Sequence, residues 1–576
     1  MVHVPRCRTV VVVVLLGVVV WGAAAAWLLL DARAALEDGR VELQAVRRGA
    51  TPSTLLDSDT GRALDRAGSD LARARSRLRS PLLTPLRLVP LVGRHLRAGD
   101  RVVATAQGAS TLADDAVADL GDLAEQPVSD GPERLAALDD LAGIVSRTQR
   151  GLARLDPGSP DALVGPLGDA VAELGAERDD SVASLRRADQ AIGAVTRVLG
   201  GPAPYLLIGA NNAEMRAGSG MFLSATSLGF DHGALDLGDV RPTEQLVLPV
   251  GAVPVTGDLA ANWPWLDGGR DLRNMGLTAD FPQSAALAAT NWAQVPGGGE
   301  VGGVIVVDVD ALRGLLRAVG PVEVDGVRYT AETVRGELLR AQYARFGDDR
   351  EGRRDQLGEV AKAVFERIDD GDWELDRLAT ALVDAVQRRN LLVWSADDEV
   401  QDALATAGAD GHLRADSLSV AVLNRGAEKL DAYLDTSATL ASERVGGGRV
   451  AVSLTYRITN RAPGKGPKYQ VGPNISGLEA GEHRGIVVVN LPAGATDVTL
   501  AGATQTLAGS DGPTLVMAGE VALRRGESVD VEVSAVLPAG LEQVVLEPSA
   551  RIPRTRWTVE GQTFDIDRRR TVALTG

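Results

Sequence analysis

The stretch that decides the fold runs from YLLIGANNAEMRAGSG (residues 205–220) to QYARFGDDREGRRDQLGEVAKAVFERI (residues 342–368). Its first apolar run, Tyr205–Gly209, has the length of a strand and is followed by a polar loop. Two further runs, Met221–Phe230 and Ala234–Val240, flank the turn sequence Asp231-His232-Gly233 and predict a β-hairpin. Strands and polar loops in this order indicate an α/β domain, where binding groups gather in the loops.

Helices and strands continue to alternate downstream. A helix is predicted near Gln283–Trp292, a buried strand at Val304–Val309 and a second helix at Asp310–Val319. The pattern continues with a helix at Trp373–Arg388, and a short strand and a helix follow at residues 391–394 and 397–407. We therefore predict an α/β domain over residues 200–440.

The composition limits the classes of function. At 576 residues the chain is long enough for several domains. Its net charge of −17 argues against nucleic-acid binding, because a phosphate backbone would be repelled. The single cysteine, Cys7, excludes an intramolecular disulfide.

An uncharged apolar segment, Thr9–Leu30, lies near the N-terminus. Its 22 residues would span about 33 Å as a helix, which is enough to cross a bilayer. Arg6 and Arg8 precede it, so residues 1–8 are predicted to be a cytoplasmic tail of a single-pass plasma-membrane protein. The alternative is a signal peptide cleaved near Ala23–Ala26. Either way, residues from Asp31 onward are expected outside the cytoplasm.

Two more regions flank the α/β domain. Residues 31–199 show helical apolar stripes, including Leu64, Leu71 and Leu78 at heptad spacing, and predict a helical stalk or bundle. After Gly446-Gly447-Gly448, strand-length alternating segments predict an immunoglobulin-like β-sandwich over residues 446–576.

Common catalytic motifs are weak or missing. The glycines of residues 297–302 match a dinucleotide motif only in spacing, because they precede a strand instead of following one. The five histidines are scattered without the spacing of a zinc site.

Three polar clusters remain as candidates for binding. Arginines can grip phosphate, and carboxylates among them could hold Mg²⁺. Internal ion pairing on a solvated surface is the alternative for each cluster. The ligand-binding candidates are Asn211, Asn212, Glu214, Arg216, Arg270, Arg273, Asn274, Arg345, Arg350 and Arg353. The candidate Mg²⁺ ligands are Asp271, Asp280 and Asp348.

Four pieces of the chain carry a resemblance to a known family. They are NNAEMRAGSGMFLS, RDLRNMGLTADFPQSAALAATNW, GVIVVDVDALRGLLRAVGPVEVDG and LLVWSADDEVQDALATAGADG. Together they resemble an uncharacterised bacterial membrane-anchored family, domain of unknown function 4012, from Tyr205 to Leu434. That resemblance implies no established activity.

The order of the pieces is also similar, more distantly, to the LytR-CpsA-Psr family. Its members transfer glycan polymers from polyprenyl-pyrophosphate carriers to the bacterial cell wall, with arginines on the pyrophosphate and an Asp on Mg²⁺. Arg216 matches the arginine of the first motif, and the last motif resembles Arg345, Asp348 or Asp349, Arg350, Arg353 and Gln356. Two groups depart from the pattern: Gly218 or Ser219 replaces an Asp, and Pro249 is followed by Val250 and Gly251 instead of Arg and Asp.

These observations predict an extracytoplasmic envelope protein that binds, and if catalytic transfers, an anionic polyprenyl-pyrophosphate-linked glycan or wall polymer. Arg216, Arg345 and Arg350 would converge with Arg270 or Arg273 on one anionic group, with Mg²⁺ as the implied cofactor. The alternative is a non-enzymatic envelope scaffold or adhesion protein with a degenerate α/β domain and protein partners in the envelope.

Overall fold

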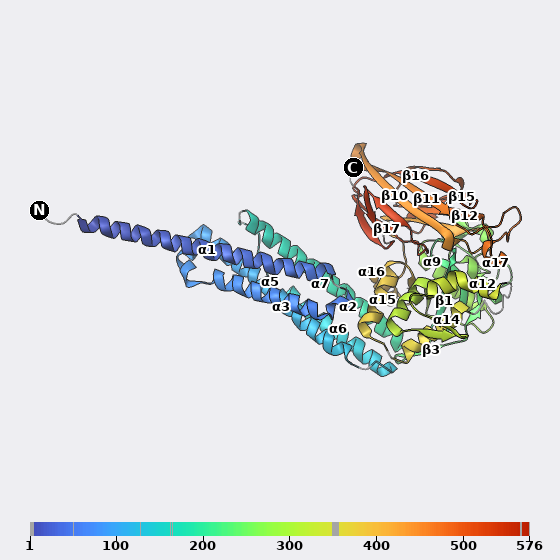
Figure 1. Ribbon diagram of the computed structural model, residues 1–576, viewed down its shortest axis with the longest axis horizontal. Helices are drawn as coiled ribbons and strands as arrows, with labels where there is room; N and C mark the ends of the chain where they lie inside the picture. Colours follow the sequence, from blue (N-terminus) through green and yellow to red (C-terminus); the bar gives the residue numbers. More distant parts are fainter. Residues whose placement is uncertain are drawn as a thin grey trace. The chain divides into compact units, whose positions relative to one another are not determined.

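A computed structural model of the chain describes residues 5–49, 51–126, 128–161, 163, 165–347, 356–371, 373–564 and 567–574 (Figure 1). The chain forms two compact units. The first, the helical unit, contains residues 1–126 and 136–193, and the second, the head, contains residues 127–135 and 194–576.

The helical unit is built from long helices, which confirms the helical content expected for residues 31–199. Leu64 and Leu71 of the predicted heptad stripe are buried, and Gly39 lets α1 approach Leu71 closely. The elements that lie wholly or mostly in this unit are α1 (Pro5–Gly49), α2 (Pro52–Leu55), α3 (Ser58–Leu78), η1 (Pro81–Leu83), α4 (Thr84–Arg87), α5 (Pro90–Ala124), α6 (Gly131–Ala153) and α7 (Pro166–Gly200).

The predicted membrane segment forms part of a longer helix. Thr9–Leu30 lies within α1, which continues without a break to Gly49. Among the described residues, α1 is the one helix long and apolar enough to cross a membrane, as an anchor or as a signal sequence.

The head begins with a mixed sheet in the order β3-β2-β1-β5-β8. β1 and β5 are parallel neighbours, while β2, β3 and β8 are antiparallel to the strands they join. The predicted hairpin is confirmed: Asp231 pairs with Ala234, and His232 and Gly233 adopt the positive φ angles that a tight turn requires. The strands are β1 (Ala203–Met215), β2 (Gly220–Asp231), β3 (Ala234–Leu237), β4 (Arg241–Pro242), β5 (Gly303–Asp308) and β8 (Leu391–Ser395).

Alternate residues of this sheet enter two different cores. Leu206 and Ile208 face one core with Trp292, whereas Tyr205 and Leu207 face the other. The helices predicted at 283–292, 310–319, 373–388 and 397–407 are confirmed, with shifted ends. The helices of this part are α8 (Gly257–Asn262), α9 (Phe281–Gln294), α10 (Val309–Val319), α11 (Val334–Gly336), α12 (Gln342–Phe346), α14 (Gln356–Asp369), α15 (Leu375–Gln387) and α16 (Asp398–Ala407), with the π-turn η5 (Glu337–Ala341) and the short turns η2 (Thr243–Gln245), η3 (Pro264–Leu266) and η4 (Leu272–Asn274). A small hairpin joins β6 (Val322–Val324) and β7 (Val327–Tyr329).

The C-terminal part contains two six-stranded sheets, which we call the inner and outer sheets. The inner sheet has the order β14-β15-β12-β9-β17-β20, and the outer sheet β13-β16-β11-β10-β18-β19. Their strands are β9 (Ser417–Asn424), β10 (Leu434–Val445), β11 (Arg449–Asn460), β12 (His483–Leu491), β13 (Thr496–Ala501), β14 (Thr504–Asp511), β15 (Thr514–Leu523), β16 (Ser528–Leu537), β17 (Gln543–Glu547), β18 (Arg556–Val559), β19 (Gln562–Phe564) and β20 (Arg570–Ala573). The short elements η6 (Asp431–Tyr433) and α17 (Lys468–Val471) lie in the connections.

The start of these sheets differs from the expected boundary at residue 446. β9 and β10 precede that residue, and each is an internal strand of its sheet. The triple glycine forms the turn of the β10–β11 hairpin, where Val445 pairs with Arg449 and Gly447 has a φ of 78°. The glycines therefore lie within the sandwich, where they supply the positive φ angles of a tight turn.

The central strands β9 and β12 of the inner sheet are buried on both faces, whereas its edge strand β14 is largely exposed. From β9, Leu418, Val420 and Val422 enter a core shared with the outer sheet. Ala421 and Leu423 point the other way, into the core that contains Leu206 and Ile208 of β1. The sandwich and the α/β sheet therefore share a continuous apolar contact, which explains why both belong to one compact unit.

Candidate functional site

The parallel strands β1 and β5 bring polar side chains together at their carboxyl ends. Asp308 ends β5 and caps α10, accepting from the backbone amides of Asp310 and Ala311 at 2.9 Å each. Asn212 and Asn390 donate their side-chain amides to Asp308 Oδ2 at 2.8 and 2.7 Å. This edge of an α/β sheet is the usual place for a ligand.

In this protein the edge is covered by the chain itself. The segment after β17 supplies the Ala550 carbonyl, which accepts from Asn212 Nδ2 at 2.7 Å. Arg554 from the same segment binds Asp310 at 3.0 Å, and Arg335 binds the same carboxylate. Asn212 and Asp308 are consequently 0% exposed.

Burial controls the electrostatics of this edge. It raises the pKa of Asp308 to about 7, against the four donors that favour the carboxylate. Burial also acts to raise the pKa of Asp310, but Arg335 and Arg554 hold it below its ordinary value. Asp308 therefore caps α10, and Asp310 binds the two arginines.

The first polar cluster consists of Asn211, Asn212, Glu214 and Arg216. Its other three members are also buried, and each contacts another polar group of the head. Asn211 donates to the Tyr343 hydroxyl at 3.3 Å. Glu214 forms an ion pair with Lys429, a residue between the two sandwich strands β9 and β10, and both side chains are less than 10% exposed. Arg216 lies 3.9 Å from Glu214 and donates to the carbonyls of Met215 and Asn424.

A buried polar network, which sequence reasoning did not identify, continues from this ion pair. Asn424 bonds both Asp431 and Glu428, and Glu428 accepts from His483 at 3.0 Å. Arg551 lies 3.8 Å from Asp431, and the side chains of all these residues are buried. The Glu428 carboxylate raises the pKa of His483, although burial opposes it. No sequence signal identifies this network, because its members come from segments as far apart as residues 424 and 551.

The second polar cluster, which contains Arg270, Asp271, Arg273 and Asn274, lies close enough to Arg216 to affect its pKa. Burial lowers the pKa of Arg216 to about 10; Asp431 and Asp271 oppose this shift, and the positive charge of Arg273 adds to it. Arg273 is itself held by Asp271 through two side-chain nitrogens, with a shortest distance of 2.6 Å. The structure thus brings Arg216 and Arg273 into one region, with Asp271 as a counter-charge.

The remaining candidates of these clusters that the structure describes have partners within the head. Arg270 donates to the Leu248 carbonyl at 2.7 Å, and Asn274 donates to the Leu266 carbonyl at 2.8 Å. Arg345 pairs with Glu337. Asp348, Arg350 and Arg353 lie outside the described residues.

Asp280 belongs to a separate polar group at the start of α9. It accepts from His412 at 2.8 Å, from Gln283 at 2.9 Å and from the Leu413 amide at 2.9 Å. The two described candidates for Mg²⁺ binding therefore contact different groups: Asp280 accepts these three hydrogen bonds, whereas Asp271 pairs with Arg273. Within the described ranges, no group of three or more His, Cys, Asp or Glu side chains is arranged to hold a metal ion.

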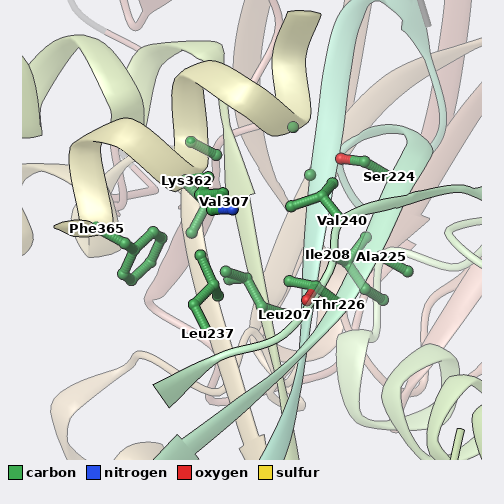
Figure 2. A pocket seen from close by; sticks show the side chains of 13 residues that line it. Leu207, Ile208, Ser224, Ala225, Thr226, Leu237, Val240, Val307, Lys362 and Phe365 are labelled. Atoms are coloured by element: carbon green, nitrogen blue, oxygen red, sulfur yellow. The ribbon is translucent and has the colours of Figure 1, made fainter. Parts of the chain in front are cut away.

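A small pocket lies between α14 and the face of the α/β sheet (Figure 2). Leu207, Leu237 and Phe365 line it, with Lys362 beside them. Its accessible volume is about 10 Å³, enough for about one water molecule. A Cβ atom on Gly358 would lie 2.3 Å from Val240, so α14 approaches the segment between β3 and β4 as closely as a glycine allows. The pocket formed by these described residues is therefore too small to hold a lipid chain.

The comparisons with known proteins identify one domain. A model of the family described as "Protein of unknown function (DUF4012)" matches residues 200–343. A search of curated proteins finds no match to the chain, and a search of solved structures finds none either. The match covers β1 to the start of α12 and supports a domain of unknown function in this part of the head.

Proposed function

We propose that this protein is a single-pass membrane protein whose extracytoplasmic head serves as a non-enzymatic scaffold that binds a partner in the cell envelope. The observation that carries the proposal is the closure of the carboxyl edge of β1 and β5. Ala550 and Arg554 of the sandwich occupy the place where an α/β sheet usually holds a ligand. A reacting group has no route to Asp308 in this arrangement, because the carboxyl group is fully buried.

The ion pairing of the candidate arginines supports the same conclusion. Arg273 is neutralised by Asp271, and Arg345 by Glu337. A pyrophosphate clamp needs guanidinium groups that can turn to the ligand, and these two already hold carboxylates. Both partners are close in the sequence, so the two pairs stabilise the turn η4 and the helical stretch of η5 and α12.

The membrane anchoring rests on α1. Ala25, Leu28 and Ala35 of this helix are buried among residues of the helical unit. Cleavage near Ala23–Ala26 would cut an unbroken helix within the part that packs, so an uncleaved anchor fits better than a signal peptide. Arg6 and Arg8 before the apolar run favour a cytoplasmic N-terminus.

Binding of an anionic polyprenyl-pyrophosphate-linked glycan is the second candidate function, and one observation favours it. Arg425 stacks at 4.3 Å over the ring of Trp265, which is 52% exposed. Burial, together with Arg216 and Arg484 nearby, lowers the pKa of Arg425. An anionic ligand would relieve this repulsion.

Native mass spectrometry of the detergent-purified full chain tests the choice between the two. The scaffold proposal expects no polyprenyl-pyrophosphate glycan to co-purify, and no consumption of added lipid in the presence of Mg²⁺. Bound lipid that is lost in Arg425→Gln but kept in Arg457→Gln would overturn it in favour of the second candidate. Arg457 is the matched control because it pairs with Asp530 on the outer sheet and is 60% exposed.

A further inference from the structure

The connection between α3 and α5 exposes an unusual number of apolar side chains. We call residues Pro81–Val92 the apolar tip. The exposed fractions are 49% for Leu82, 81% for Leu88, 45% for Val89, 68% for Leu91 and 37% for Val92. A contiguous apolar patch of this kind marks an interaction site.

The apolar tip lies beside the membrane-spanning part of α1. The Trp21 indole donates to the Leu82 carbonyl at 2.9 Å. Ala25 and Leu28 of α1 pack with Leu83 and Leu96 in one small core.

The direction of α5 fixes the depth of the tip. Leu96 of α5 packs with Leu28 of α1, and Val103, further along α5, packs with Ala35. The two helices therefore run parallel, and Leu91 lies about 12 Å before the level of Asp31 at the helical rise per residue. The tip is thus level with the last part of the apolar stretch Thr9–Leu30.

The charges around the tip complement a lipid surface. Residues 81–99 contain three arginines, Arg87, Arg94 and Arg97, and no carboxylate. Arg77, at the end of α3, forms an ion pair with Asp31 at 2.8 Å and lies 5.0 Å from the Trp27 ring. Tryptophan and arginine at one level are typical of a membrane interface.

The backbone of the tip also suits an apolar surrounding. Pro81, Pro85 and Pro90 have no amide hydrogen that would need a partner. The Leu83, Leu88 and Val89 amides donate within the tip and to Ser80, at 3.0–3.3 Å. Burial of this segment in lipid would therefore leave few backbone donors unsatisfied.

We infer that the apolar tip inserts into the outer leaflet of the bilayer that α1 crosses. This inference rests on the membrane anchoring in the proposed function. The helical unit then contacts the membrane at two points, through α1 and through the tip beside it. Arg94 and Arg97, which follow the tip on α5, face lipid phosphates, while Arg87 within the tip donates to the Leu78 carbonyl at 2.7 Å. A bilayer fits better than a second copy of the chain because Val19 and Val20 of α1, near the level of the tip, are exposed apolar side chains as well.

Fluorescence quenching by spin-labelled lipids tests the inference on the full chain in phosphatidylcholine vesicles. In a Cys7→Ser background, single variants Leu88→Cys and Leu91→Cys carry an environment-sensitive dye. Val20→Cys reports on the anchor, and Arg62→Cys, exposed on α3, is the aqueous control. The expected result is at least twofold quenching at positions 20, 88 and 91 and little at position 62.

Each other outcome is decisive. Quenching at position 20 together with values at 88 and 91 equal to those at 62 refutes insertion of the tip and leaves the anchoring intact. Absence of quenching at position 20 refutes the anchoring itself. A blue shift at 88 that grows with the protein-to-lipid ratio, without quenching, refutes lipid insertion and assigns the tip to contact with a second copy.

Discussion

Replacement of Lys429 by Met should destabilise the head strongly. Lys429 and Glu214 form an ion pair whose side chains are 3% and 7% exposed, and it joins β1 to the segment after β9. Removal of one partner of a buried pair costs about 3–5 kcal/mol, because the other charge is left without compensation. Arg216 remains 3.9 Å from Glu214, so we expect the low end of this range, about 3 kcal/mol.

Urea unfolding of the detergent-solubilised full chain, followed by tryptophan fluorescence, measures this effect. Six of the eight tryptophans lie in the head, so the signal reports mainly on that unit. The double variant Glu214→Gln/Lys429→Met should recover most of the loss, since neither charge is then left alone. Arg457→Met, which breaks an exposed pair, should cost under about 1 kcal/mol. A loss for Lys429→Met as small as that of Arg457→Met would refute the reasoning.

Three further predictions follow from burial, from strand order and from the proposed membrane orientation. Burial raises the pKa of Asp308 to about 7 and those of Asp511 and Asp567 to about 6, so these folded carboxyls keep protons that the unfolded chain releases near pH 4. The free energy of unfolding of the head should therefore fall as pH rises from about 4 to 7, and Asp567→Asn should show a shallower fall in thermal melts; an equal slope would contradict this. A fragment that starts at Gly446 lacks β9 and β10 and should show no cooperative melting by circular dichroism, whereas a sharp transition would show that the sheets form without them. Protease added to intact, wall-stripped cells should digest the head; a head that is protected would place it inside the cell.

Local signals explain the parts of the fold that the sequence predicts. Asp231-His232-Gly233 predicts its hairpin because a tight turn needs residues that tolerate positive φ, and His232 and Gly233 have φ values of 50° and 80°. The helix that begins after Asp308 is also predictable, since an acid at the end of an apolar strand is a good cap.

Long-range pairing explains what the sequence does not predict. β9 reads SLSVAVLN and could belong to either domain by its apolar content, because its partners β12 and β17 lie more than 50 residues further along the chain. The sequence shows which arginines are candidates for binding, but it does not show which residues they contact in the fold. Arg273 pairs with a residue two positions away, whereas Arg216 donates to Asn424, 208 residues distant.

The contact between Asn212 and Ala550 also has a consequence for biogenesis. The two residues are separated by 338 positions, so β1 has left the ribosome long before the segment that covers its end exists. At about 5–20 residues per second, synthesis of that interval takes roughly 20–70 s. During this time Asn212 and Asp308 are not yet covered by the segment that contains Ala550. The apolar face of β1 also remains unpaired until β9 and β12 of the inner sheet have been made. The head must therefore mature after synthesis is nearly complete, and a chain truncated before residue 550 leaves an open polar edge that quality-control proteases can recognise.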